Sequence, residues 1–277
     1  MAQSSTFPSH VAENTFKFPP WTVIVRKSHI LQSRCTNVPN CHMQLNDTFS
    51  KSNLCDFCLY EKELDLPQLP EMTFAGNLLH VEHSKELGIE FNALSALQLV
   101  DSKFDSMKVA VAEAWQESRL DNSEIKDVVK PFDWTFTTHY KGTLIGNKEN
   151  YTVTPTDERI NIEKLKVKEK ILFYEDVMLF EDELADNGTA HCSVKIRIMP
   201  DCFFILMRYF LRVDNLLVRI IDTRIFHEVG KSYILQEHVT KESKVKELKV
   251  DVSLLRNPQL LWDHLPTVDF QYEKIQF

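Results

Sequence analysis

The sequence predicts an α+β fold in which two mostly antiparallel β-sheets pack on each other in a single domain, with a few short helices. Patterns typical of strands outnumber those typical of helices, and the helical patterns stand between runs of strands rather than after each one. Turn residues separate several neighbouring strand patterns, as they do in hairpins. The length of 277 residues fits one large domain, because single cores stop growing at about 250 to 300 residues.

The N-terminal part is predicted to contain little regular structure. Residues 1 to 18 are expected to form a flexible tail, and the domain is expected to span residues 19 to 277. Alternating residues from Trp21 to Arg26 predict a first strand, which starts after the Pro19-Pro20 pair. Residues 31 to 66 are polar, irregular and rich in cysteine, so we interpret them as a surface insertion.

Short strands and helices are predicted in the next part of the chain. Met72 to His83 should form two short strands around Gly76-Asn77, and Gly88 to Phe91 a further strand that leads into a helix capped by Asn92. A second helix is predicted over Ser106 to Ser118, whose apolar stripe is typical of core packing.

The middle of the chain contains another alternating segment and another helix start. Asp133 to Lys141 is predicted to form a half-buried strand, because aromatic residues and threonine occupy every second position. Ile160, Asn161 and Leu165 have the spacing of a hydrophobic staple around the first turn of a short helix. Ile160 therefore also has a purely structural interpretation.

Strand patterns dominate the C-terminal half. Lys170 to Glu183 and Thr189 to Met199 flank Asp186-Asn-Gly188, a strong turn signal, so they are predicted to pair as a hairpin. The last strand is predicted at Ser232 to His238. The charged run after Thr240 predicts a solvated helix or loop.

The segment predicted to carry function is a hairpin. Its strands, Phe203 to Val213 and Leu216 to Glu228, are joined by Asp214-Asn215, residues that tolerate the left-handed backbone of a two-residue turn. In that register Tyr209 opposes Ile220 and Met207 opposes Asp222.

This register gives the hairpin two different faces. One face carries apolar residues with Ile220, Asp222 and Arg224, and the other carries Arg208, Arg212 and Arg219 among aromatic residues. Asp222 and Arg224 can pair, either as a structural ion pair or as the rim of a partner site. The three arginines suit a carboxylate, which guanidinium groups bind bidentately, or they pair with acids elsewhere in this chain.

Composition argues against several classes of function. A net charge of −8 argues against nucleic acid as the partner. The longest apolar run is too short to span a bilayer, and the first twenty residues lack the features of a secretory signal. We therefore expect a soluble protein of the cytoplasm, with the nucleus as a further compartment, and six cysteines kept as free thiols.

Few residues have the pattern of a catalytic or metal site. The six glycines form no phosphate-binding loop or nucleophile elbow. Cys55 and Cys58 have zinc-knuckle spacing, but five residues separate Cys35 from Cys41, which favours irregular loop thiols over a structural zinc. We therefore expect a protein that is not an enzyme and that binds no cofactor and no metal. If a metal were bound, Cys35, Cys41, Cys55 and Cys58 would be its candidate ligands. A metal-dependent hydrolase that uses them, or the carboxylates of Phe180 to Asp186, is the alternative.

Several blocks of residues together resemble one protein family. The blocks are Leu69-Pro-Glu-Met72, Gly88-Ile-Glu-Phe-Asn-Ala93, Ala114-Trp-Gln-Glu-Ser-Arg119, Lys130-Pro-Phe-Asp-Trp-Thr-Phe-Thr-Thr138, Tyr140-Lys-Gly-Thr-Leu144, Leu179-Phe-Glu-Asp-Glu-Leu184, Ser193-Val-Lys-Ile-Arg197 and Asp222-Thr-Arg224. In this order they resemble the TIPRL family, the TOR signalling pathway regulator-like proteins, over about Trp21 to Thr240.

The resemblance implies a non-enzymatic regulator that binds the catalytic subunit of type 2A serine/threonine phosphatases, including its acidic C-terminal tail. It would inhibit the subunit or hold it during assembly, and feed into TOR signalling. Carried over by position, Ile160, Ile220 and Asp222 are expected at the partner surface. Ser95 stands where the family often has Asp, which removes a charge favourable to the helix dipole and a partner contact. We expect the protein to be a monomer. The alternative function is that of a general protein-interaction scaffold.

Overall fold

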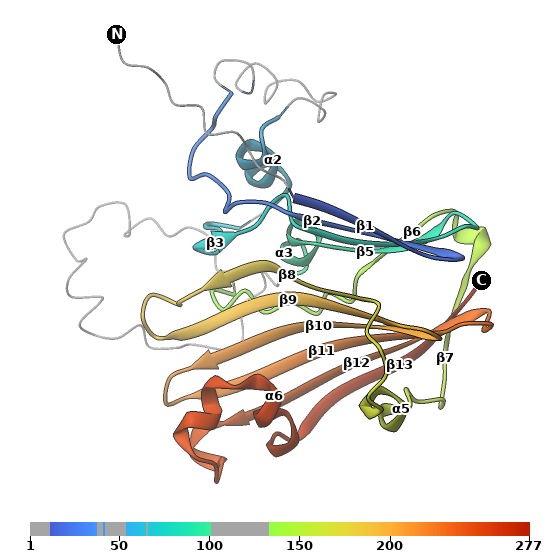
Figure 1. The fold of residues 1–277 in the computed structure, drawn as a ribbon. Coiled ribbons are helices and arrows are strands. Elements are labelled where there is room, and N and C mark those ends of the chain that lie inside the picture. Colours follow the sequence, from blue (N-terminus) through green and yellow to red (C-terminus); the bar gives the residue numbers. More distant parts are fainter. Residues whose placement is uncertain (1–11, 38–40, 42–53, 65, 101–132) are drawn as a thin grey trace, which may run out of the picture.

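The computed structural model describes residues 12–37, 41, 54–64, 66–100 and 133–277. Two β-sheets lie one above the other, with short helices at their ends and on the outer side of the larger sheet (Figure 1). The predicted α+β class with two packed, mostly antiparallel sheets is therefore confirmed. No helix in the described part of the chain is long and apolar enough to cross a membrane.

The smaller sheet has five strands in the order β1-β2-β4-β5-β6, and all neighbours are antiparallel. These strands are β1 (Ala12–Phe18), β2 (Trp21–Lys27), β4 (Leu78–His83), β5 (Leu87–Asn92) and β6 (Thr143–Ile145). Every second residue of β2, namely Trp21, Val23 and Val25, is buried in the core. This alternation is the reason why one face of the sheet packs on the larger one.

The larger sheet has eight strands in the order β3-β8-β9-β10-β11-β12-β13-β7. They are β3 (Met72–Thr73), β8 (Phe173–Asp182), β9 (Gly188–Met199), β10 (Cys202–Val213), β11 (Leu217–Glu228), β12 (Tyr233–Lys244), β13 (Thr267–Gln276) and β7 (Thr152–Pro155). Strands β8 to β12 follow one another in the chain and pair in that order, as predicted for the hairpin around Asp186-Asn-Gly188.

The main core lies between the two sheets. Alternate residues of β10 point into it and are almost fully buried: Phe203, Ile205, Met207, Tyr209 and Leu211. Burial of each such side chain contributes roughly 1.5 to 3 kcal/mol. The residues between them therefore lie on the opposite, outer face of the larger sheet.

Helices are short in the described part of the chain. They are α2 (Asp56–Glu63), α3 (Ala93–Leu97), α5 (Ile162–Lys166) and α6 (Pro258–Leu261), with 3-10 turns η2 (Lys148–Asn150), η3 (Val245–Glu247), η4 (Val252–Arg256) and η5 (Trp262–His264). The predicted cap of α3 is confirmed, because Asn92 Oδ1 accepts a hydrogen bond from Ser95 N at 2.7 Å. The predicted cap of α5 is confirmed too, since Asn161 Oδ1 accepts from Lys164 N at 3.1 Å.

The N-terminal third contains more structure than the sequence predicts. Ala12–Phe18, expected within the tail, forms β1 and pairs with β2, so the tail prediction is wrong for these residues. Helix α2 lies within the segment interpreted as an irregular insertion. The helix predicted over Ser106 to Ser118 lies outside the described residues.

Two strand predictions are wrong in the second half of the chain. Asp133 to Lys141 forms no strand, because Phe136 has a φ of 55° and Asp133 Oδ1 accepts from Thr135 N at 3.0 Å, which closes a turn. Only an isolated bridge joins Thr138 to Val100 within the described residues. The strand at Ser232 to His238 extends to Lys244 and is followed by β13, so it is not the last one.

The register predicted for the β10–β11 hairpin is wrong by one residue. The loop has three residues, Asp214 to Leu216, in which Asn215 has a φ of 60° and Leu216 N donates to Val213 O at 3.1 Å. Arg208 therefore opposes Asp222, and Tyr209 opposes Ile221. A one-residue shift moves every side chain of one strand to the other face.

Candidate protein-binding face

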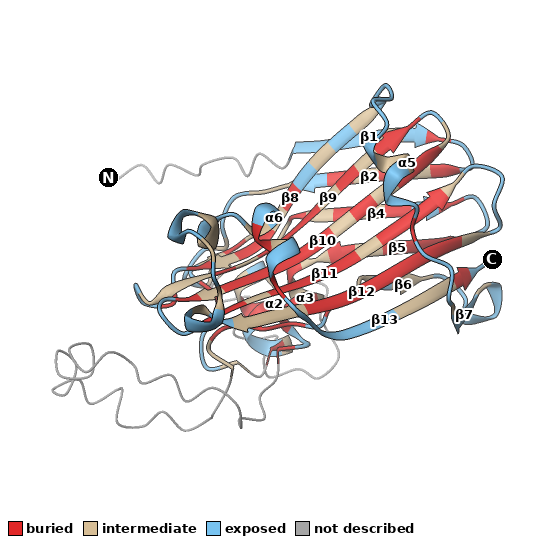
Figure 2. Ribbon diagram, turned by 90° about the horizontal axis from the view of Figure 1, so that it is seen from below, coloured by how far each residue is buried: buried red, intermediate tan, exposed pale blue. Residues whose placement is uncertain are grey.

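The outer face of the larger sheet is covered at both ends and less covered between them. The segment of residues 245–265 packs on Phe210, Val218 and Ile220. Ile160, just before α5, and Leu165, within it, pack with Phe226 and Leu235. Figure 2 shows α6 and α5 over the sheet, with parts of β10 to β12 visible between them. We call the residues of this middle region the outer strip: Leu206, Arg208, Asp222, Arg224, Lys241 and Phe270.

An ion-pair network occupies the centre of the outer strip. Arg208 donates from Nε to Asp222 Oδ1 at 2.6 Å and from Nη2 to Asp222 Oδ2 at 2.8 Å. Arg224 Nη2 also donates to Asp222 Oδ2, at 3.1 Å. The Asp222 side chain is fully buried, whereas 19% of the Arg224 side chain is exposed. A buried carboxylate requires such partners, so Asp222 fixes the position of both guanidinium groups.

The indole ring of Trp262 lies beside this network. The charged ends of Arg224, Lys241 and Arg208 lie 4.4, 4.6 and 5.6 Å from its ring centroid, within the range of cation–π attraction. Lys241 Nζ also donates to Trp262 O at 2.8 Å. Arg224 is thus held between a carboxylate and an aromatic ring, and its hydrogen bond to Asp222 uses one of the five N–H donors of a guanidinium group.

Burial shifts the titration of two groups beside the strip. It lowers the pKa of Lys241, and the nearby Arg224 lowers that pKa further while Asp263 raises it. Burial also lowers the pKa of His191 to about 4, aided by Arg208 and Lys195. His191 is therefore neutral at neutral pH, and the cations of this face are Arg and Lys side chains.

Exposed aromatic surface continues the outer strip toward β13. Arg208, Asp222, Val239 and Phe270 lie opposite one another on the neighbouring strands β10, β11, β12 and β13. Phe270 is 60% exposed. The rings of Phe270 and Tyr272 lie 5.1 Å apart, and Arg159 Cζ lies 3.5 Å from the Tyr272 centroid. Aromatic residues and arginine carry most of the binding free energy in protein interfaces, so this face has a suitable composition for a protein partner.

Six of the eight predicted partner-binding residues lie on this face. Arg208, Arg212, Ile220, Asp222 and Arg224 alternate along β10 and β11 on the outer side, so their predicted division between two faces is wrong. Ile160 is buried at the α5 end, where its backbone N donates to Glu237 Oε1 at 2.8 Å. Ile220 is likewise buried, beneath the segment of residues 245–265.

The two remaining predicted residues lie elsewhere. Arg219 is on the inner side of β11, where it pairs with Glu242 and donates from Nη1 to Thr137 Oγ1 at 3.0 Å. Ser95 is in α3, which directly follows β5 of the smaller sheet. The structure thus separates Arg219 and Ser95 from the outer strip.

The arginines of the hairpin are paired within the chain. Besides the Asp222 network, Arg212 Nε lies 2.8 Å from Asp214 Oδ1, and Arg219 pairs with Glu242. This confirms the alternative in which acids of the same chain partner the arginines. Within the Asp222 network, the side chain of Arg224 is more exposed than that of Arg208.

Sequence reasoning missed Trp262, Lys241 and Phe270. Trp262 and Phe270 lie beyond the segment assigned to strands, and Lys241 lies in the charged run assigned to solvent. The available signal was the alternation of Phe270, Tyr272 and Lys274, which predicts one face of a strand.

The structure also brings the four predicted cysteine ligands together. The Sγ atoms of Cys35, Cys41, Cys55 and Cys58 all lie within 4.8 Å of one another. This cluster lies at α2, outside the outer strip and the elements that cover it. Among the described residues, these four cysteines form the cluster whose ligand atoms lie close enough together to hold a metal ion.

The fold and this face define a double-sheet protein with an exposed aromatic and cationic surface on its larger sheet. The family model described as the TIP41-like family matches residues 72–249, so the chain belongs to that family, which confirms the resemblance seen in the sequence. The matched region includes β8 to β12 with the Asp222 network, whereas the cysteine cluster and Trp262 lie outside it.

Several named relatives are similar to most of the chain. The TIP41-like protein of Homo sapiens is 44% identical over 263 residues, which cover 95% of this chain and 89% of the relative. The type 2A phosphatase activator TIP41 of Saccharomyces cerevisiae is 36% identical over 233 residues, covering 76% of this chain and 65% of the relative. The type 2A phosphatase activator tip41 of Schizosaccharomyces pombe is 30% identical over 273 residues, covering 96% of this chain and 99% of the relative.

Proposed function

We propose that the chain binds the catalytic subunit of type 2A serine/threonine phosphatases through the outer strip and thereby regulates the phosphatase. Two relatives carry the name type 2A phosphatase activator, and this supports the choice of partner. The observation that supports the choice of surface is Arg224, held between Asp222 and Trp262 on a partly open aromatic face. This activity depends on binding and requires no catalytic group or cofactor.

Arg224 is the residue that we assign to a carboxylate of the partner. Its guanidinium is oriented by Asp222 and by the Trp262 ring before the partner arrives. Such orientation reduces the entropy lost on binding, and guanidinium binds carboxylates with two parallel hydrogen bonds. The acidic C-terminal tail of the phosphatase supplies groups of this kind, and Phe270 offers apolar surface beside them.

The buried residues of the face have a positioning role in this proposal. Asp222 and Arg208 hold the network in place, while Ile220 and Ile160 anchor the two segments that cover the ends of the sheet. Their replacement should weaken binding through displacement of Arg224 and of the covering segments. Residues with little exposed surface can thus still be required for binding.

We further propose that the protein acts as a monomer in TOR signalling, in the cytoplasm and the nucleus. A selective regulator and a general scaffold differ in the range of partners recovered from cells. Affinity purification of the tagged chain should recover type 2A catalytic subunits as its main partners. A broad set of unrelated partners at similar abundance would favour the scaffold.

Titration calorimetry with the purified catalytic subunit tests the proposal. We expect a 1:1 complex, and a Kd at least about tenfold weaker when the C-terminal tail of the phosphatase is removed, the loss of one charge-assisted contact. No binding to the intact subunit would refute the function. Equal affinity for the intact and truncated subunits would refute the role of the tail only.

The direction of regulation is measured in the same complex. Phosphatase turnover of a phosphopeptide, followed with increasing amounts of this chain, should rise if the chain acts as the names of the yeast relatives state. A fall in turnover would identify an inhibitor or a holding factor. Unchanged turnover at saturating chain would contradict regulation by direct binding.

A further inference from the structure

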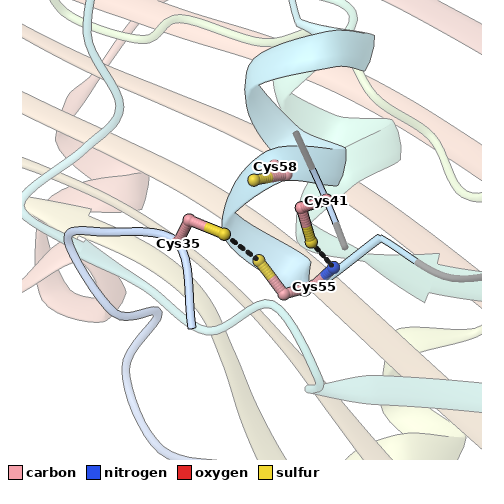
Figure 3. A group of neighbouring side chains, drawn as sticks. All are labelled: Cys35, Cys41, Cys55 and Cys58. Carbon is pink, nitrogen blue, oxygen red and sulfur yellow. Dashed lines mark hydrogen bonds between the residues drawn. The ribbon is translucent and has the colours of Figure 1, made fainter. Parts of the chain in front are cut away.

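Four cysteines from the stretch between β2 and the first turn of α2 converge beside that helix (Figure 3). Cys35 follows β2, Cys41 lies six residues later, and Cys55 and Cys58 lie at the N-terminus of α2. Cys41 and Cys58 are fully buried, with 0% and 2% exposure, and Cys35 and Cys55 are half-buried. Four thiols that converge on one point, two of them fully buried, are unusual for unrelated loop residues.

The separations of the sulfur atoms match those of ligands around one metal ion. Zinc binds cysteine sulfur at about 2.3 Å, so a tetrahedral site places neighbouring sulfurs about 3.8 Å apart. Sγ of Cys55 and Sγ of Cys35 lie 3.8 Å apart, and no pair in the cluster exceeds 4.8 Å. A disulfide would instead require about 2.05 Å between two of the sulfurs, and all six cysteines are free.

The local backbone explains how the ligands meet. Cys55 is the N-cap of α2 and Cys58 lies one turn further on, so both side chains lie at the same end of the helix. The backbone N of Cys55 donates to Cys41 Sγ at 3.3 Å, and Cys41 N donates to Asn37 O at 3.0 Å. The positive end of the helix dipole and this N–H group both favour a thiolate, the form of cysteine that binds metal.

Helix α2 is short and reaches the main core through Tyr60 and its C-cap Leu64. It has eight residues, with Cys58 and Tyr60 as its buried side chains, and it forms one wall of a cavity of about 380 Å³ that Leu31 and Leu69 also line. A short helix beside a cavity obtains little stabilisation from packing. A metal ion joined to Cys35 and Cys41 would connect α2 to the chain that follows β2.

We propose that Cys35, Cys41, Cys55 and Cys58 bind one Zn²⁺ ion in a structural, tetrahedral site. Four sulfur ligands select zinc over Ca²⁺ and Mg²⁺, and they leave no position for a reacting water. Each thiol releases its proton to solvent when it binds the ion. The site therefore stabilises the fold around α2, and it is independent of the proposed phosphatase binding.

Metal analysis of the full chain tests this site. Protein made with added zinc and purified under reducing conditions should contain one zinc per chain by mass spectrometry. Cys35→Ser and Cys58→Ser should each lose that zinc. The matched control Cys202→Ser, a buried thiol in β10 outside the cluster, should keep it. Replacement of zinc by Co²⁺ in the wild-type chain should give the visible absorption bands of a tetrahedral thiolate complex. This measurement uses the wild-type chain alone, so it is unaffected if a variant fails to fold.

Zinc removal should also lower the melting temperature. A chelator should destabilise the wild-type chain and the Cys202→Ser control alike, and should leave an already zinc-free Cys35→Ser chain unchanged. Wild-type protein that takes up neither Zn²⁺ nor Co²⁺ in stoichiometric amount would overturn the proposal.

Discussion

The two faces of the β10–β11 hairpin come from the same twenty-odd residues and behave differently. The inner face carries apolar residues that pack in the core between the sheets, such as Phe203, Ile205 and Tyr209. The outer face carries Arg208, Asp222 and Arg224 in a network that excludes most of the solvent. The difference shows that the inner face is optimised for packing, whereas the outer face holds charges whose positions depend on one another.

The largest effect is expected for the carboxylate of the network. Asp222→Asn leaves Arg208 and Arg224 without a charged partner, which should lower the free energy of unfolding by about 3 to 5 kcal/mol. Urea unfolding measures this loss. The double variant Arg208→Met with Asp222→Leu should recover part of it, because apolar side chains can replace the buried Arg208–Asp222 pair while Arg224 stays without its carboxylate. A loss below about 1 kcal/mol would show that the network contributes little to stability.

A neighbouring pair of residues compares the two faces directly. Ile205→Ala removes a fully buried side chain from the inner face and should cost about 3 kcal/mol of unfolding free energy. Leu206→Ala, one position later on the outer face, is half-buried and should cost under about 1 kcal/mol. Equal losses in thermal unfolding would contradict the assignment of the faces.

Acid should weaken the inner face through His238. Burial, and then His139 and Lys141, lower the pKa of His238 to about 4 in the folded chain, against about 6.5 when unfolded. The folded state therefore favours the neutral ring, so this stability is present above pH 6.5 and is lost as the pH falls toward 4. The loss between pH 6.5 and 5 should be about 2 kcal/mol.

The variant His238→Leu isolates this contribution. The unfolding free energy of the wild type should fall relative to that of the variant as the pH drops from 6.5 to 5, because only the wild type must protonate a ring at position 238. Thr223 Oγ1 loses its contact with His238 Nδ1 in the variant but keeps Tyr140 O at 3.3 Å. A difference between the two chains that does not change with pH would contradict the lowered pKa.

The smallest effect is expected for an exposed ion pair on the smaller sheet. Arg26 Nε lies 2.6 Å from Glu13 Oε2, and about half of each side chain is exposed. Arg26→Gln should change the unfolding free energy by less than about 0.5 kcal/mol, since solvent screens such pairs. A loss comparable to that of Asp222→Asn would show that burial is not what distinguishes the two networks.

Much of the fold could be predicted from the sequence, because alternation and turn residues are local signals. Asp186-Asn-Gly188 located the β8–β9 hairpin, and Asn92 and Asn161 located two helix starts. The β10–β11 register could not be fixed in this way, since Asp214-Asn215 fits a two-residue or a three-residue loop. Inclusion of Leu216 in the loop moves Asp222 to the side of Arg208.

The candidate sites depend on contacts between distant segments, which local patterns do not contain. Trp262 reaches the network from beyond β12, and nothing in its neighbourhood in the sequence indicates this. The cysteines had one zinc-like spacing, at Cys55 and Cys58, but the position of Cys35 depends on how the chain returns to α2.

The most direct test of the central claim uses two arginines of one strand that face opposite ways. Arg224 lies on the outer side of β11 and Arg219 on the inner side, and each pairs with a carboxylate. We expect Arg224→Gln to raise the Kd for the type 2A catalytic subunit at least about tenfold in calorimetry. Arg219→Gln should leave the Kd unchanged, and the two variants are compared at equal melting temperature. Binding through the outer strip would be contradicted if Arg224→Gln bound the subunit as tightly as the wild type, or if Arg219→Gln lost more affinity than Arg224→Gln.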